Sequence, residues 1–174
     1  MTQKQIIDIS DVHLICDLDG TLLKNDFFFE KLLEMLIINP LSVFYFLNRS
    51  ITEIKKGILK NSINTNEINA LINPNVAILL KDNKKKYKSL SLISASPDEF
   101  VKKIAKQIEI FDLAIGSDNY NLKGKSKLNY ILENNLTPYV YIGDSSADNI
   151  LFKHSLFYYK VNSDNSLSKH ENIS

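Results

Sequence analysis

The chain has 174 residues, 44% of them hydrophobic, and a formal net charge of +1. This length and apolar content suffice for one packed core and a small accessory element. The near-neutral charge gives no basis for a nucleic-acid partner, and the basic run Lys81–Lys88 is interpreted as a solvated helix end. The single cysteine, Cys16, excludes a disulfide framework and is expected to be a buried thiol. Residues 1–12 are polar and mixed in charge, unlike a secretion signal, so we expect a cytoplasmic protein.

Short apolar runs alternate with helical periodicity along the chain, which is typical of an α/β fold with a parallel sheet covered on both faces. The expected strands are His13–Cys16, Leu90–Ile93, Leu113–Gly116, Tyr139–Ile142 and Leu156–Val161. The expected helices between them begin at Pro97, run from about Lys125 to Glu133, and run from about Ala147 to His154. The tail, residues 163–174, is polar enough to be loosely ordered.

The alternation is interrupted between Thr21 and Leu90, a gap longer than one crossover helix needs. The stretches in it that are compatible with helices are Phe27–Ile38, Leu41–Lys60, Asn66–Leu71 and Val76–Tyr87. We therefore expect a helical cap insert at residues 26–75, with residues 1–25 and 76–174 forming the core. Because open α/β sheets bind ligands beyond the carboxyl ends of their strands, an insert after the first strand would act as a lid.

The most apolar segment is Leu32–Leu47, which raises the question of a membrane span. It is shorter than the roughly 20 residues that a span requires, and Glu34, Asn39 and Pro40 interrupt it. Two packed amphipathic helices broken at Pro40 explain the segment better. An apolar surface that touches a lipid or a partner is the alternative.

Two carboxylates follow the first expected strand in the run Asp17-Leu18-Asp19-Gly20-Thr21. Such a pair suits phosphoryl transfer, because Asp17 can attack phosphorus while Asp19 protonates the leaving oxygen and then activates water. A bare pair of this kind also suits a polar loop or a helix cap, so the remaining polar runs decide between these interpretations.

Two of these runs could bind phosphate. Ser94-Ala95-Ser96 closes the second expected strand, where the Ser94 hydroxyl and nearby backbone amides could hold a phosphate oxygen, although a helix N-cap is the simpler interpretation. A lysine in Gly124-Lys125-Ser126-Lys127, at a helix start, could neutralise charge on the phosphate and on the attacking carboxylate. Each signal is weak alone.

The strongest companion is the run Gly143-Asp144-Ser145-Ser146-Ala147-Asp148 after the fourth expected strand. Its two acids lie around a turn into a helix, which suits one to ligate a metal and the other to orient the ligands. Magnesium prefers hard oxygen ligands. Asp17, the Asp19 carbonyl and Asp144 would supply them.

In order and context these runs resemble the motifs of the haloacid dehalogenase-like superfamily of phosphohydrolases. DLDGT is similar to the first motif, Ser94 to the second, a lysine near 125–127 to the third and GDSSAD to the fourth, over residues 13–162. The resemblance implies a Rossmann-like, doubly wound parallel five-stranded sheet, Mg²⁺ as cofactor and an aspartyl-phosphate intermediate. The implied roles are Asp17 as nucleophile, Asp19 as general acid and base, Ser94, Ala95 and the lysine as phosphate binders, Asp17, Asp19 and Asp144 at the metal, and Asp148 behind these ligands.

Within the superfamily, the chain resembles the phosphoserine-phosphatase-like members, which carry a small helical cap. It is more similar still to the hydrolase domain fused to UbiA-type prenyltransferases, where a run NLKGxxK is typical. Here that run is Asn121–Lys127, which favours Lys127 over Lys125 as the phosphate-site lysine. No prenyltransferase sequence follows, so we expect a freestanding protein or an excised part. An association with a membrane prenyltransferase is left open.

The implied function is Mg²⁺-dependent hydrolysis of a small phosphorylated metabolite, since Asp19 is an acid that a phosphate ester needs and a carbon-halogen bond does not. A phosphotransferase or mutase using the same aspartyl phosphate is one alternative, and a non-catalytic regulatory module that binds phosphate and Mg²⁺ is another. In the insert, the aromatic residues at 27–29 and 44–46 fit a cap core. Asp26 and Glu30 could meet a substrate hydroxyl or amine. Oligomeric state and substrate stay open.

Overall fold

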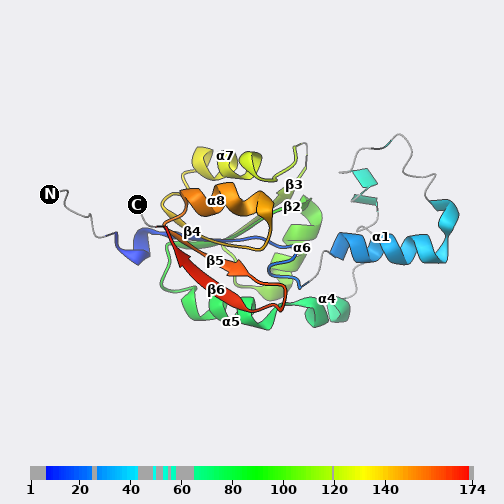
Figure 1. Cartoon of the computed structure of the whole chain (residues 1–174), viewed down its shortest axis with the longest axis horizontal. Helices are drawn as coiled ribbons and strands as arrows, with labels where there is room; N and C mark the ends of the chain where they lie inside the picture. Colours follow the sequence, from blue (N-terminus) through cyan, green and yellow to red (C-terminus); the bar gives the residue numbers. More distant parts are fainter. Residues whose placement is uncertain are drawn as a thin grey trace.

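The computed structural model describes residues 7–24, 27–42, 49, 53–54, 56–57, 65–118 and 120–172. Its centre is a sheet with the strand order β3-β2-β1-β4-β5-β6 (Figure 1). The strands are β1 (His13–Cys16), β2 (Ser89–Pro97), β3 (Leu113–Ser117), β4 (Tyr139–Gly143), β5 (Phe157–Val161) and β6 (Leu167–Glu171). Strands β1 to β5 pair in parallel, which confirms the α/β prediction and all five expected strands.

A sixth strand corrects two predictions, namely that the sheet has five strands and that residues 163–174 are loosely ordered. β6 pairs antiparallel with β5 from Phe157↔Glu171 to Val161↔Leu167. The turn between them is closed by a hydrogen bond from Asn162 N to Ser166 O (2.9 Å). Within β6, Leu167 is the residue that packs against the apolar core, so hydrophobic alternation was too weak to indicate a strand.

Helices cover both faces of the sheet (Figure 1). On one face, α5 (Pro74–Asn83) and α6 (Asp98–Ile108) pack on alternate residues of β1 and β4, among them Leu14 and Val140. On the other face, α7 (Lys125–Glu133) and α8 (Asn149–His154) pack on the residues between, among them Ile15 and Tyr141. Because successive strand residues point to opposite faces, one buried strand contributes to both cores. This is the doubly wound arrangement that was predicted.

The helix bounds follow the predictions with small shifts. α7 has the expected bounds, whereas α5 begins at Pro74 and ends four residues before the expected Tyr87. Pro97 is the N-cap residue of α6 and the last residue of β2. The helix expected from Ala147 is divided into the short 3-10 helix η3 (Ser146–Asp148) and α8. Two further 3-10 helices are η1 (Ile9–Asp11) and η2 (Pro40–Ser42).

The segment between β1 and α5 leaves and rejoins the core at one place. Leu23 and Ile72 form an antiparallel bridge, flanked by hydrogen bonds from Lys24 N to Leu71 O and from Asn73 N to Leu22 O (both 2.9 Å). We call residues 22–24 and 71–73 the stem. Between its two sides lie α1 (Phe27–Ile38), which extends away from the sheet, and α4 (Thr65–Leu71), whose Ile68 is fully buried in the core (Figure 1). The division of the chain at residues 26 and 75 stays a prediction.

Parts of the predicted insert lie outside the described residues. These parts are most of the helix expected at Leu41–Lys60, residue Asp26, residues 44–46 and the side chains of residues 27–30. α1 ends before Pro40, as expected, and exposes Leu33, Ile37 and Ile38. Among the described residues, no helix has the length and apolar character needed to cross a membrane.

Candidate active site

β1 ends with Cys16 in the middle of the sheet, and the chain then turns sharply. Asp17 N still donates to Ile142 O of β4 (3.0 Å), and Leu22 N donates back to Asp17 O (3.4 Å). Gly20 has a φ of +71°, and a Cβ at this position would overlap the Asp144 carboxylate. Leu18 and Leu22 are fully buried and anchor the turn. Because the buried leucines hold the turn in place, they also fix the positions of the Asp17 and Asp19 side chains beside them.

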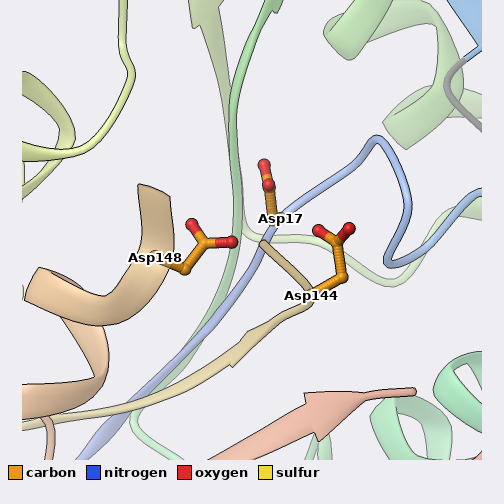
Figure 2. Close-up of side chains that lie close together, drawn as sticks. All are labelled: Asp17, Asp144 and Asp148. Atoms are coloured by element: carbon orange, nitrogen blue, oxygen red, sulfur yellow. The ribbon is translucent and has the colours of Figure 1, made fainter. Parts of the chain in front are cut away.

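Three carboxylates from two strand ends meet at this turn (Figure 2). Asp17, Asp144 and Asp148 each offer an oxygen, and these oxygens lie within 4.8 Å of one another. Asp144 directly follows β4, and Asp148 lies in η3, where both Ser145 N (3.1 Å) and Ser145 Oγ (2.8 Å) donate to its Oδ2. Carboxylate oxygens are the donors that Mg²⁺ prefers. The donor set therefore fits a magnesium site, and it groups Asp17 and Asp144, which were predicted as ligands, with Asp148, which was predicted to lie behind them.

Lys127 supplies positive charge to the cluster from α7. Its Nζ donates to Asp17 Oδ1 (2.8 Å), and its side chain is 3% exposed. Lys125 is exposed at the start of the same helix. The structure thus places Lys127, the preferred lysine of the sequence prediction, beside Asp17.

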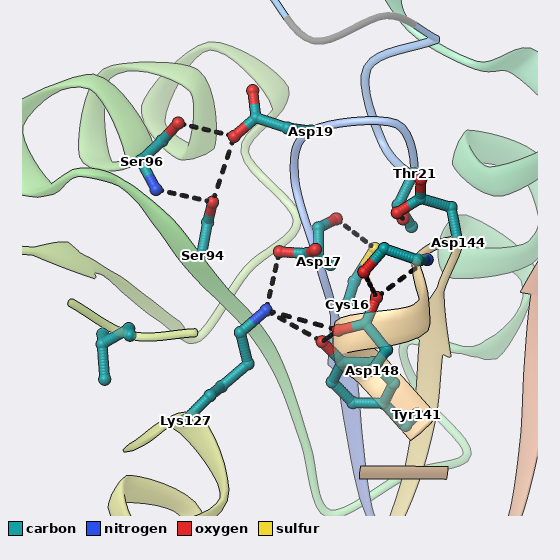
Figure 3. Close-up of polar contacts among 12 residues, drawn as sticks. Cys16, Asp17, Asp19, Thr21, Ser94, Ser96, Lys127, Tyr141, Asp144 and Asp148 are labelled. Carbon is teal, nitrogen blue, oxygen red and sulfur yellow. Dashed lines mark hydrogen bonds and ion pairs between the residues drawn. The ribbon is translucent and has the colours of Figure 1, made fainter. Parts of the chain in front are cut away.

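Tyr141 also belongs to the site, and the sequence prediction missed it. Its hydroxyl accepts from Lys127 Nζ and donates to Asp148 Oδ1, both at 2.9 Å (Figure 3). A tyrosine in a buried strand resembles a core residue, and Tyr141 does pack in the core. The available signal was that a buried phenol needs a hydrogen-bond partner and that Tyr141 shares the sheet face of α7.

Asp19 points away from this cluster toward β2 (Figure 3). Its Oδ2 accepts from Ser96 Oγ (2.5 Å) and lies 3.4 Å from Ser94 Oγ, which in turn accepts from Ser96 N (3.0 Å). Both serines are buried and lie within β2, whose register with β3 shifts between Ile93 and Pro97. Ser94 therefore lies near the acidic turn as predicted, and Ser96 is an additional contact of Asp19. The predicted contribution of Asp19 to a metal stays a prediction.

Burial dominates the electrostatics of the acidic cluster. It raises the pKa of Asp17 above its ordinary value, against the opposing effect of Lys127. Burial, with the nearby Asp17 and Asp148, raises the pKa of Asp144 to about 6, although Thr21 Oγ1 donates to it (3.2 Å). Burial likewise raises the pKa of the Tyr141 phenol, which stays protonated, and that of the Cys16 thiol, which is buried as expected. A divalent cation would relieve this crowding of negative charge.

Residues 56–57, which belong to the predicted insert, lie near the end of β3. Lys56 Nζ lies 2.6 Å from Asp118 Oδ1, directly after that strand. The two side chains are well exposed, so the pair contributes little stability by itself. It does place residues 56–57 at the carboxyl edge of the sheet, where the acidic turn also lies.

Sequence comparison gives a relative of unknown function. No protein-family model matches the chain. Uncharacterized protein y4nM of Sinorhizobium fredii is 31% identical over 142 residues, which are 78% of this chain and 27% of that protein, so the chain spans only a part of its length.

Solved structures match over most of the chain at low identity. Phosphoserine phosphatase in its apo form has a TM-score of 0.56 at 15% identity, covering 86% of each chain. A hydrolase of the HAD family from Salmonella enterica serovar Typhi has a TM-score of 0.57 at 16% identity, covering 84% of this chain and 61% of that chain. Phosphoserine phosphatase also matches as a phospho-aspartyl intermediate analogue and as a substrate complex.

These matches support the predicted fold but not the more specific family likeness. They support the α/β fold as a whole, since each covers more than four fifths of this chain. The more specific likeness to domains fused to prenyltransferases stays a prediction, since y4nM is uncharacterised. The chain has the fold of the haloacid dehalogenase-like hydrolases, with phosphoserine phosphatase among its structural neighbours.

Proposed function

We propose that this protein is a Mg²⁺-dependent phosphohydrolase that cleaves a small phosphate monoester through an aspartyl phosphate on Asp17. The observation that carries the proposal is the environment of Asp17. Its carboxylate is 13% exposed, 2.8 Å from the Lys127 ammonium and grouped with Asp144 and Asp148. A carboxylate held this way at a strand end suits attack on phosphorus, because the surrounding charges are already in place.

Asp17 would act as the nucleophile. Lys127 binds Oδ1, which leaves Oδ2 as the oxygen that attacks phosphorus in line with the leaving group. The Ser94 hydroxyl and the Ala95 backbone amide would hold phosphate oxygens, and Lys127 would neutralise the negative charge spread over them. The bond from phosphorus to the ester oxygen breaks as the bond to Asp17 forms.

Asp19 would act as the general acid and then the general base. Ser96 holds its Oδ2 at 2.5 Å, so the carboxyl group has a fixed orientation on the β2 side of the turn. Its proton goes to the leaving oxygen in the first step. In the second step, Asp19 takes a proton from the water that hydrolyses the aspartyl phosphate, which restores both carboxyl groups.

Asp17 and Asp144, with Asp148 beside them, would hold the magnesium ion. When bound, the ion supplies charge stabilisation for the transferring phosphoryl group. The Asp144 pKa of about 6 leaves this carboxylate largely ionised at neutral pH, when it can serve as a ligand. The substrate-bound phosphoserine phosphatase among the structural neighbours supports a small phosphorylated metabolite as substrate.

The test is Mg²⁺-dependent release of phosphate from p-nitrophenyl phosphate, followed by a screen of phosphorylated metabolites that includes phosphoserine. We expect turnover by the wild-type chain, and loss of turnover with chelator or with Asp17→Asn. Addition of an acceptor alcohol shows whether phosphate goes to water or to the alcohol. Folded wild-type protein that binds Mg²⁺ but releases no phosphate from any monoester would contradict the proposal.

A further inference from the structure

A buried phenol lies between the ammonium and one carboxylate of the candidate site. The hydroxyl of Tyr141 accepts a hydrogen bond from Lys127 and donates one to Asp148 Oδ1, both at 2.9 Å (Figure 3). Tyr141 is fully buried on β4, and its ring packs edge-to-face on Tyr139 and Phe152. The hydroxyl therefore has little freedom to move.

Lys127 lies between two carboxylates that compete for its ammonium. Nζ is 2.8 Å from Asp17 Oδ1 and 3.9 Å from Asp148 Oδ1. A direct bond between an ammonium and a carboxylate is shorter and stronger than a bond to a neutral hydroxyl. Asp148 would therefore attract Lys127 if nothing stood between them.

The hydroxyl of Tyr141 prevents that direct contact. Ser145 donates twice to Asp148 Oδ2, so Oδ1 is the oxygen that Lys127 would take. Without the phenol oxygen, Oδ1 loses its donor and Nζ loses an acceptor, and each becomes the nearest new partner of the other. A buried group that loses its partner pays a large desolvation penalty, which favours this rearrangement.

We propose that Tyr141 is a positioning residue: its hydroxyl keeps Lys127 apart from Asp148 and directs the ammonium toward Asp17 and the phosphoryl group. The kinetic consequence rests on the proposed function, whereas the placement of Lys127 does not. The two parts can therefore fail separately.

The placement is tested by crystal structures of the wild-type and Tyr141→Phe proteins. We expect Lys127 Nζ to move into hydrogen-bond distance of Asp148 and out of hydrogen-bond distance of Asp17. Tyr139→Phe is the matched control, since it removes a buried hydroxyl from the same face of β4 that donates to Leu151 O (3.0 Å) outside the site. Lys127 should not move in this control. A Lys127 that stays on Asp17 in Tyr141→Phe overturns the proposal.

A double variant covers the case in which Tyr141→Phe does not fold. Asp148→Asn combined with Tyr141→Phe removes the competing charge, so we expect a folded protein in which Lys127 is again bonded to Asp17. If Lys127 is displaced in this protein as well, competition with Asp148 is not what the hydroxyl prevents, and the proposal is wrong.

Kinetics test whether the effect passes through Lys127. We expect Tyr141→Phe to lower kcat about tenfold with a smaller change in KM, because charge neutralisation matters most in the transition state. In a Lys127→Met background, the same change should alter kcat less than about twofold. If Tyr141→Phe lowers kcat by the same factor in the Lys127→Met background as in the wild type, the proposal is overturned. Absence of turnover in the wild type refutes the proposed function instead, and the crystal structures still decide the placement.

Discussion

The two ends of the central parallel strands differ in the charge of the polar groups that they bury. At the amino end, His13 Nδ1 pairs with Ser89 Oγ (2.7 Å), and burial lowers the pKa of His13, so the ring is neutral near pH 7. At the carboxyl end, three carboxylates lie close together, the Lys127 ammonium pairs with those of Asp17 and Asp148, and burial raises the pKa of Asp17 and Asp144.

This difference in charge indicates that the amino end contributes mainly to stability and the carboxyl end mainly to ligand binding. Burying the neutral His13–Ser89 pair at the amino end costs less free energy than burying several like charges together. Like charges held together at the carboxyl end are unfavourable to the isolated fold, and a bound cation or phosphate ester would reverse that cost. Substitutions of paired groups at the amino end should therefore change stability and leave activity unchanged. Substitutions at the carboxyl end should change activity and have a smaller effect on stability.

The largest contrast is expected between Asp17→Asn and Asp112→Ala. Asp17→Asn should lower kcat at least about 10³-fold, since it removes the nucleophile, while the melting temperature changes little. Asp112 accepts a hydrogen bond from Leu90 N at the amino end (2.8 Å). Asp112→Ala should lower the free energy of unfolding by about 1 kcal/mol and leave kcat unchanged. Phosphate release and thermal unfolding of both variants measure this, and an active Asp17→Asn protein would contradict the comparison.

The next effect is the dependence of stability on pH and Mg²⁺. Raised pKa values mean that the folded state binds protons more tightly than the unfolded state. In chelator, this contribution is complete below the ordinary Asp pKa of 3.8 and is lost as pH rises through the Asp144 value of about 6. Mg²⁺ at 100 times its Kd should add about 2.7 kcal/mol at pH 7.5.

Urea unfolding at pH 4.5 and 7.5, with chelator and with Mg²⁺, measures both quantities. Asp144→Asn is the control, because it should flatten the loss of stability with pH in chelator and weaken the effect of Mg²⁺. Equal pH dependence in the wild type and in Asp144→Asn would show that Asp144 is not the group responsible.

A smaller effect is expected for Ser96→Ala, which removes the hydroxyl that holds Asp19. We expect kcat to fall about tenfold, less than the roughly 10²–10⁴-fold contribution of a general acid, since Asp19 itself remains. The loss should be greater for an alkyl phosphate than for p-nitrophenyl phosphate, because an alkoxide needs protonation more. Equal losses on the two substrates would exclude a role of Ser96 in positioning the acid.

The smallest effect is expected for Ser91→Ala, on the same strand as Ser96 but nearer the amino end. The Ser91 hydroxyl is buried without a hydrogen-bond partner among the residues that the structure describes. Its removal should leave kcat unchanged and change the free energy of unfolding by less than about 1 kcal/mol, toward greater stability. A marked loss of stability on urea unfolding would show that the hydroxyl has a partner, such as a buried water.

Strong local signals explain which parts could be predicted from sequence. β1 is fully buried and largely apolar, α7 buries Leu128 and Ile131, and both elements have the predicted bounds. β6 was missed because its burial pattern is weak. The Asp17 turn, Asp144 and Lys127 meet because parallel strand ends converge, as the motifs indicated. Tyr141 and Ser96 were missed because their contacts depend on which sheet face and register they occupy.

The stem allows the segment that it encloses to evolve separately from the sheet. Residues 22–24 and 71–73 run side by side, and Asn73 and Asn75 both donate to Asn165 O in the β5–β6 turn (3.3 and 3.0 Å). The chain between α1 and α4 can therefore be lengthened or replaced without breaking a strand pair of the sheet, at a loop-closure cost of about 0.6 kcal/mol per doubling of length. Under the proposed function, a segment grafted at the stem would change the substrate preference while the acidic side chains of the core stay unaltered.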